Sequence, residues 1–281
     1  MRPLTIAIAV LGLGGYLQAQ APPLPKLLSS EELARQPQTP RATGDQERHY
    51  YFAEAAKEMP YRLYVPLRWN GRAKLPMIVA LHGAYSTHDT LMTAVQGTVE
   101  TQAETHGYIV VSPLGYAPLG GYGQHYDIGF KPPRDGANAE EQERASRLSE
   151  EDVMKVVALV AEEYGVDQSR IYLMGHSMGG LGTWYLGEKY REKWAGLAPI
   201  AGGFEDADYP WERLRGMPVL VSNGSADTVA VPSRARKQVA AMEKAGLHPV
   251  YLEVPGATHV SILDSVFPRI FEFFDQNKRT R

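Results

Sequence analysis

The sequence contains no cysteine, and this absence excludes several classes of protein. A chain of 281 residues without a thiol has no disulfide framework, no zinc–thiolate or iron–sulfur centre and no cysteine nucleophile. An excess of charge of one sign is also missing, because 29 Lys and Arg residues face 32 Asp and Glu residues, for a formal net charge of −3. Such a chain has no bulk positive field for nucleic acid, so we expect no nucleic-acid partner.

Long apolar runs are absent after the first twenty residues, so we expect no membrane span. The run from Leu4 to Tyr16 follows the positive charge of Arg2 and is shorter than the roughly 20 residues that a bilayer requires. Residues 18–21, which read QAQA, then supply small side chains for a signal peptidase. We therefore interpret residues 1–20 as a secretory signal peptide and expect a secreted or periplasmic protein.

The remainder of the chain divides into two parts by composition. Residues 21–45 are rich in proline and are expected to form a tether or a strap over the surface. From there on, strand-like and helix-like runs alternate with no second composition regime. This predicts a single folded domain over residues 46–281.

The alternating runs predict the class of fold. Apolar runs predict strands at residues 50–53, 61–65, 75–81, 108–112, 170–174, 197–201, 219–222 and 250–254. Helical patterns cover residues 88–105, 149–164, 181–190, 234–245 and 262–275. The first two strands are close enough to pair as an antiparallel hairpin. Strands that alternate with helices of this length predict an α/β fold, in which a mostly parallel sheet is covered by helices on both faces.

The connection between the predicted strand at 108–112 and the predicted helix at 149–164 is unusually long. Residues 113–148 are predicted to be irregular, with a Gly- and Tyr-rich half followed by an acidic half. Ser149, with the carboxylate of Asp152 three residues later, is typical of a capping box that begins a helix. Val153 and Val156 then begin one apolar helical face, and Gly165 is expected to end the helix.

A candidate nucleophile lies between a predicted strand and a predicted helix. Residues 175–179 read GHSMG, which matches the pattern G-x-S-x-G in the context that the pattern requires. There a tight, strained turn presents the Ser177 hydroxyl at the carboxyl end of the sheet. Glycines at 175 and 179 avoid side-chain clashes where strand and helix meet. The backbone N–H of Met178 is expected to point to an oxyanion.

A serine needs a base, and His259 is the candidate among the eight histidines. It follows the last predicted strand and lies in a loop at the carboxyl edge of the sheet. Asp227 follows the strand at 219–222 and can orient His259 and stabilise its imidazolium form. The alternative acids, Asp206 and Asp208, follow the preceding strand. The order Ser177, Asp227, His259 is that of the α/β-hydrolases.

The second oxyanion donor is expected after the strand at 75–81, where residues 81–83 read LHG. We predict the backbone N–H of Ala84, with that of Tyr85 as the alternative, and a structural role for His82. Tyr85, Tyr116, Tyr122 and Tyr126 are candidates for an aromatic rim that contacts substrate, although ordinary packing of these loop residues is an equal alternative.

His176 is grouped with these substrate-contact candidates because it lies inside the pentapeptide, even though its side chain is expected to point away from the serine. No residue spacing indicates a metal site, and no glycine-rich loop suits a phosphate. We therefore expect no cofactor.

Several segments resemble the secreted α/β-hydrolase esterases that group with poly(3-hydroxybutyrate) depolymerases, feruloyl esterases and acetyl xylan esterases (carbohydrate esterase family 1). The segments that carry this resemblance are residues 61–66, 81–83, 170–180, 182–184, 198–203, 224–227 and 256–259. Residues 170–203 are also similar to predicted peptidases related to prolyl oligopeptidase. Depolymerases of this type commonly carry cysteines near the active site, and this chain has none.

The resemblance implies an α/β-hydrolase fold and a serine carboxylic-ester hydrolase that works through an acyl-enzyme. Its substrate would be a small-molecule or polymer-linked ester, of the feruloyl, acetyl or polyester type. Two alternatives stay open. One is a serine peptidase of the prolyl oligopeptidase type. The other is a non-enzymatic binding protein on a hydrolase scaffold, although such a protein would normally have lost a member of the triad, and all three are present here.

Overall fold

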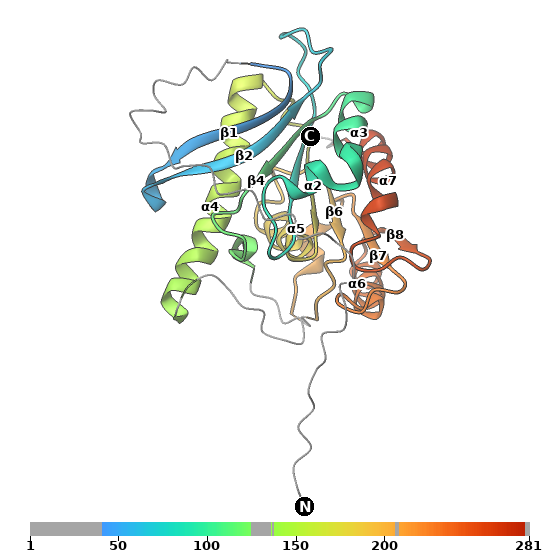
Figure 1. The fold of residues 1–281 in the computed structure, drawn as a ribbon. Coiled ribbons are helices and arrows are strands. Elements are labelled where there is room, and N and C mark those ends of the chain that lie inside the picture. Colours follow the sequence, from blue (N-terminus) through green and yellow to red (C-terminus); the bar gives the residue numbers. More distant parts are fainter. Residues whose placement is uncertain (1–40, 125–135, 137, 206–207, 279–281) are drawn as a thin grey trace, which may run out of the picture. The chain divides into compact units, whose positions relative to one another are not determined.

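A central sheet organises the computed structural model, which describes residues 41–281 except 125–135, 137, 206–207 and 279–281. Among these residues, eight strands form one sheet in the order β1-β2-β4-β3-β5-β6-β7-β8 (Figure 1). β1 pairs antiparallel with β2, and β2 pairs antiparallel with β4. All the other neighbouring pairs are parallel. The predicted hairpin and the mostly parallel α/β sheet are therefore confirmed.

The observed elements follow the predicted order. The strands are β1 (Gly44–Phe52), β2 (Lys57–Val65), β3 (Met77–Leu81), β4 (Ile109–Pro113), β5 (Ile171–His176), β6 (Gly196–Ile200), β7 (Leu220–Gly224) and β8 (Val250–Val254). The α-helices are α2 (Thr90–Thr93), α3 (Thr98–His106), α4 (Ala139–Tyr164), α5 (Met178–Lys189), α6 (Pro232–Lys244) and α7 (Leu263–Gln276). Short 3-10 helices are η1 (Ala53–Ala55), η2 (Ala94–Gly97), η3 (Gly121–Gly123) and η4 (Trp211–Leu214).

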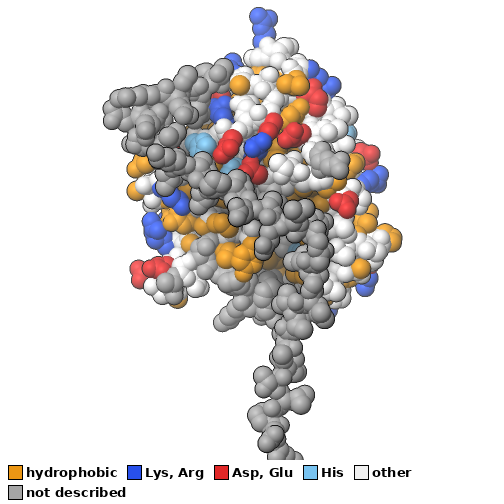
Figure 2. Space-filling model, in the orientation of Figure 1, with side chains coloured by type: hydrophobic (Ala, Val, Ile, Leu, Met, Phe, Trp, Pro, Cys, Tyr) orange, Lys and Arg blue, Asp and Glu red, His pale blue; other side chains and the backbone are white. Residues whose placement is uncertain are grey.

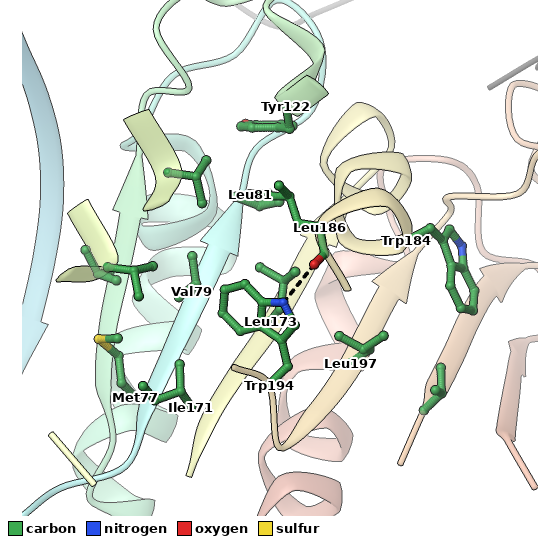
Figure 3. Close-up of a cluster of buried hydrophobic side chains, with 14 of the residues drawn as sticks. Met77, Val79, Leu81, Tyr122, Ile171, Leu173, Trp184, Leu186, Trp194 and Leu197 are labelled. Atoms are coloured by element: carbon green, nitrogen blue, oxygen red, sulfur yellow. Dashed lines mark hydrogen bonds between the residues drawn. The ribbon is translucent and has the colours of Figure 1, made fainter. Parts of the chain in front are cut away.

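Helices cover both faces of the sheet, and each face has its own hydrophobic core. Because side chains alternate along a strand, Met77, Val79 and Leu81 of β3 join the core under α4, α5 and α6 (Figure 3). Ile78 and Ala80 of the same strand face the opposite core, which α2, α3 and α7 complete. All five residues of β3 are buried, as its continuous apolar run predicts.

The helix predicted over residues 88–105 is wrong in one respect, because the chain breaks it into α2, η2 and α3. Val95 has a positive φ of 51°, and Gly97 adopts the left-handed conformation with a φ of 76° directly before α3. A right-handed helix cannot continue through such residues. Glycine adopts this conformation without the steric cost of a side chain, so Gly97 is where the chain changes direction.

The start of α4 is also corrected. The helix begins at Ala139, and Asn138 caps it by accepting a hydrogen bond from the Glu141 N–H, whereas Ser149 lies in its buried interior. Residues 139–148, in the acidic half of the segment predicted to be irregular, are therefore helical. Gly165 ends the helix in the left-handed conformation, as predicted.

The described surface carries charges of both signs. Figure 2 shows basic and acidic side chains intermixed on one face, in keeping with the formal net charge of −3. Within the described ranges, no helix has both the length and the apolar character needed to cross a bilayer. The expected signal peptide and nearly all of the proline-rich segment lie outside the described residues, and β1 begins just before the expected domain boundary.

Candidate active site

The sharp turn between β5 and α5 holds Ser177 in a strained conformation. Its backbone has a φ of 56° and a ψ of −115°, and its N–H donates to the Ile200 carbonyl at 2.9 Å. A Cβ on Gly175 would lie 2.3 Å from the Gly179 carbonyl oxygen, and one on Gly179 would lie 2.1 Å from that of Leu81. Both glycines are therefore required by the close approach of strand and helix, as the G-x-S-x-G pattern predicts.

Ser177, His259 and Asp227 form a continuous chain of hydrogen-bonding groups. His259 Nε2 lies 2.9 Å from Ser177 Oγ, and His259 Nδ1 lies 2.8 Å from Asp227 Oδ2. The carboxylate is buried, and its Oδ1 accepts the N–H groups of Val229 and Ala230 at 2.8 Å each. Because these two N–H groups fix the carboxylate, its second oxygen is held toward the imidazole.

This arrangement has a defined chemical capability. Asp227 faces Nδ1 and so favours the tautomer in which Nδ1 carries the proton, which leaves the His259 Nε2 lone pair for the serine hydroxyl. The three residues come from the segments after β5, β7 and β8, whose carboxyl ends share one edge of the sheet. The sequence therefore predicted which residues meet, and the structure brings all three together.

The loop after β3 lies against the serine. A Cβ on Gly83 would lie 3.4 Å from Ser177 Cβ and 3.3 Å from His176 Nδ1, so the chain at this point passes directly beside the nucleophile. The next residue is Ala84. Met178 directly follows Ser177 and is the first residue of α5, so its N–H has no acceptor within the helix. Both predicted oxyanion donors thus belong to segments that adjoin Ser177.

His82 ties this loop to the next strand connection. Its ring is fully buried, with Nδ1 2.8 Å from the Gly83 carbonyl oxygen and Nε2 2.8 Å from that of Leu114. Burial lowers the pKa of this imidazole. The expected structural role of His82 agrees with these contacts.

Tyr122 does not line the site, which corrects one of the expected substrate contacts. It is fully buried, and a Cβ on Gly182 of α5 would lie 2.7 Å from its ring. Its hydroxyl donates to the His82 carbonyl at 3.2 Å, and its N–H donates to Ser149 Oγ at 2.9 Å. The packing alternative therefore holds for Tyr122, because the missing side chain at Gly182 makes room for its ring beneath α5.

Tyr116 is likewise a packing residue rather than part of a rim. Its ring packs edge-on against Phe52 at 6.5 Å, and the ammonium of Lys57 lies 4.0 Å from its centre. Its N–H donates to the buried carboxylate of Asp152 at 3.0 Å. These contacts direct it toward the N-terminal hairpin. Tyr126, the fourth candidate, lies outside the described residues.

His176 is buried beneath the base instead of facing substrate, which corrects a third expected contact. Its Nε2 lies 2.7 Å from the carbonyl oxygen of His259, and the two imidazole rings are 4.8 Å apart. Burial, followed by the proximity of His259, lowers the pKa of His176 to about 4. The expectation that this side chain points away from Ser177 agrees with its contact to the His259 backbone.

Tyr85 is the predicted aromatic residue that remains exposed, at 73% of its possible surface. Two further large apolar residues close in sequence to the triad are exposed: Val229, two residues after Asp227, at 53%, and Val260, directly after His259, at 64%. Sequence patterns did not identify these valines, because neither belongs to a motif. Among the described residues, no group of three or more His, Asp or Glu side chains is arranged to hold a metal ion.

Asp152, which the sequence pattern predicted only as part of a helix cap, holds the chain after β4. It is fully buried in α4 and accepts the Tyr50 hydroxyl and the N–H groups of Gly115 and Tyr116. Burial raises the pKa of this carboxyl to about 6. Asp152 directly precedes Val153, where the apolar face of the helix begins. This position in the sequence indicates that the carboxylate is buried and must be hydrogen-bonded.

The chain is similar in sequence to known esterases and to a secreted protein. The model of the esterase family matches residues 53–254. An uncharacterized secreted protein of Arthroderma benhamiae is 26% identical over 231 residues, which are 71% of this chain and 23% of that protein. The chain spans between 19% and 23% of the length of the curated relatives that it matches.

Solved structures share the fold. The crystal structure of a thermostable esterase superposes with a TM-score of 0.65 at 25% identity, covering 84% of this chain and 63% of that one. A CE1 ferulic acid esterase from Anaeromyces mucronatus, in complex with ferulic acid, superposes with a TM-score of 0.62 at 19% identity, covering 85% of this chain and 93% of that one. The predicted α/β-hydrolase fold is therefore confirmed.

Proposed function

Because the chain belongs to the esterase family, we propose that it is a serine carboxylic-ester hydrolase that works through an acyl-enzyme. The observation that carries this proposal is the hydrogen-bonded series from Ser177 through His259 to Asp227, with separations of 2.9 Å and 2.8 Å. A serine hydroxyl in this setting has a base within reach and a carboxylate that orients the base.

The reaction follows from these positions. Ser177 Oγ attacks the ester carbonyl while His259 Nε2 accepts the hydroxyl proton, and Asp227 stabilises the resulting imidazolium. As the tetrahedral intermediate collapses, His259 returns this proton to the departing alkoxide, which leaves as an alcohol. A water molecule then gives a proton to His259 and attacks the acyl-enzyme, which releases the acid and restores the Ser177 hydroxyl.

The oxyanion of each tetrahedral intermediate needs donors on the side of the serine away from His259. We assign these to the backbone N–H groups of Met178 and Ala84, in support of which both segments adjoin Ser177. A donor aimed at the developing charge contributes about 3 kcal/mol to the stabilisation of the transition state.

The substrate proposal is an ester of the feruloyl or acetyl type, with polyester-type esters as the wider class. Its support is the shared fold with a ferulic acid esterase and the exposed apolar side chains of Tyr85, Val229 and Val260, which lie within two residues of Ala84, Asp227 and His259 in the chain. An aryl or sugar-linked acyl group would bury part of this surface on binding.

A substrate panel tests both levels of the proposal. The purified protein is assayed on p-nitrophenyl acetate, methyl ferulate, acetylated xylan, poly(3-hydroxybutyrate) and a peptide nitroanilide, with Ser177→Ala beside it and the exposed Ser265→Ala as the matched control. We expect hydrolysis of the esters by the wild type and by Ser265→Ala, and its loss in Ser177→Ala. Cleavage of the nitroanilide without ester hydrolysis would contradict the esterase proposal and support a peptidase.

Export is proposed separately, from the signal-like residues 1–20 and from the secreted relative. The test is to express the full chain in a bacterial host and to determine the N-terminus of the protein that reaches the periplasm or medium. We expect cleavage between residues 18 and 22. Retention of the intact N-terminus inside the cell would contradict this proposal.

A further inference from the structure

His176 is the buried residue that contacts both segments flanking the nucleophile. It is the last residue of β5 and directly precedes Ser177, and only 8% of its surface is exposed. Its Nε2 lies 2.7 Å from the main-chain oxygen of His259, the proposed base. Because a strand anchors one partner and a loop carries the other, this hydrogen bond fixes the backbone of residue 259 relative to the sheet.

The other ring nitrogen of His176 faces the oxyanion loop. A Cβ on Gly83 would lie 3.3 Å from His176 Nδ1, so the loop packs closely against the imidazole. One ring therefore lies between the loop that carries the base and the loop that leads to Ala84. A change in this ring would move both loops relative to Ser177.

A neutral imidazole at His176 is compatible with its position next to the ring of His259. The centres of the His176 and His259 rings are 4.8 Å apart, and His259 becomes positively charged during the reaction. A second cation at this separation would oppose that charge. Burial keeps the pKa of His176 at about 4, so its ring is neutral near pH 7 and offers its Nε2–H to the His259 carbonyl.

We propose that His176 is a positioning residue that holds the loop of the base His259 and the oxyanion loop at their working distances from Ser177. The inference rests on the proposed function, since it assigns His259 as the base. It differs from the substrate contact expected for this residue, because the imidazole acts through His259 and Gly83 and is covered by them.

Substitutions that separate the hydrogen bond from the volume of the side chain test this inference. In His176→Gln the amide N–H reaches the place of Nε2 and can donate to His259. In His176→Leu the volume is kept and the donor is lost, and in His176→Asn the shorter amide cannot reach. His248→Leu, at an exposed position, is the matched control.

With p-nitrophenyl acetate, we expect kcat to fall roughly 100-fold in His176→Leu and His176→Asn, the scale of a misplaced catalytic group, while KM stays within about twofold. His176→Gln is expected to recover most of the loss. Thermal unfolding followed by circular dichroism identifies any variant that fails to fold. Among the folded variants, the difference in kcat between His176→Gln and His176→Asn then tests the inference. Unchanged kcat in folded His176→Asn, or equal losses in Gln and Asn, would overturn the inference.

The labelling rate of Ser177 by a fluorophosphonate separates this inference from the proposed function. If the wild type is labelled but hydrolyses none of the esters, the proposed function is contradicted. The inference is then tested by the labelling rates alone, which should be similar in the wild type and His176→Gln and lower in His176→Asn. A wild type that is not labelled has no base acting on Ser177, and this outcome overturns the inference as well.

Discussion

At the scale of single residues, the local backbone fixes the positions of Ser177 and Asp227. Ser177 is held at a positive φ of 56° that non-glycine residues rarely adopt, and the Asp227 carboxylate is fixed by two backbone N–H groups. Strain of this kind costs on the order of 1–3 kcal/mol and persists only where the surrounding structure enforces it. The strain at Ser177 thus agrees with its role as the proposed nucleophile.

The role of Asp227 is tested by Asp227→Asn. The amide keeps the shape of the carboxylate but favours the wrong tautomer of His259, so we expect kcat on p-nitrophenyl acetate to fall by about 10⁴. Asp264→Asn, at an exposed position on α7, serves as the control and is expected to retain full activity. A loss smaller than tenfold in Asp227→Asn would mean that the carboxylate does not orient the base.

Individual residues also show where prediction from sequence ends. Ser177, Asp227 and His259 could be identified because each follows a strand and their order is characteristic. The fates of Tyr122 and His176 could not, because burial beneath α5 or against His259 depends on packing between segments that are distant in the sequence. A tyrosine in a glycine-rich loop looks the same in sequence whether its ring lines a pocket or fills the core.

At the scale of secondary-structure elements, the close packing of α5 against β3 holds the turn that carries Ser177. α5 approaches β3 so closely that a Cβ on Gly179 would lie 2.1 Å from the Leu81 carbonyl oxygen. The same helix covers Tyr122 at Gly182. The small residues of α5 therefore set the distance between the helix that follows Ser177 and the sheet.

Gly179→Ala is expected to lower the free energy of unfolding by several kcal/mol and to abolish hydrolysis, because backbone atoms must move to admit the methyl group. Gly165→Ala provides the matched control: Gly165 has open space around it and a φ of 61°, so only the conformational cost of about 1–2 kcal/mol for a left-handed alanine is expected. Urea unfolding and ester hydrolysis measure both effects. Similar behaviour of the two variants would contradict the close-packing explanation.

α4 also acts as an element, since its buried polar side chains hold the chain after β4. Asp152 accepts hydrogen bonds from the N–H groups of Gly115 and Tyr116, and Ser149 accepts that of Tyr122. The helix thereby fixes the segment that reaches His82 through the Tyr122 hydroxyl. The sequence does not indicate this connection, because Ser149 and Asp152 match the spacing of a helix cap equally well.

The buried carboxyl of Asp152 predicts a pH dependence of stability. Its pKa is raised from 3.8 to about 6 in the folded state, so the folded protein binds more protons than the unfolded chain between these values. The contribution of this group to stability is therefore largest at low pH and falls as the pH rises toward 6. The non-titrating Asp152→Asn should gain stability relative to the wild type over this range, by up to about 3 kcal/mol.

Urea unfolding of both proteins at pH 4, 5, 6 and 7 measures this difference. Asp264→Asn controls for the loss of one carboxylate at the surface, where no trend of this size is expected. A difference between Asp152→Asn and the wild type that does not change with pH would contradict the raised pKa.

At the scale of the whole molecule, the two cores account for a stable chain without cysteine. Helices bury apolar side chains on both faces of the eight-stranded sheet, so no disulfide is needed to stabilise a domain of this size. The fold class and the order of its elements could be predicted because periodic apolar runs mark strands and helices. The break at Gly97 and the early start of α4 could not, because both depend on local backbone conformation that the periodicity does not report.

The proposed mechanism requires that Ser177 form an acyl-enzyme. The most direct measurement mixes the protein with p-nitrophenyl acetate, quenches it with acid during the burst and maps the acetyl group by peptide mass spectrometry. We expect acetylation of Ser177 in the wild type and none in Ser177→Ala. An acetyl group on another residue, or hydrolysis that continues unchanged in Ser177→Ala, would contradict it.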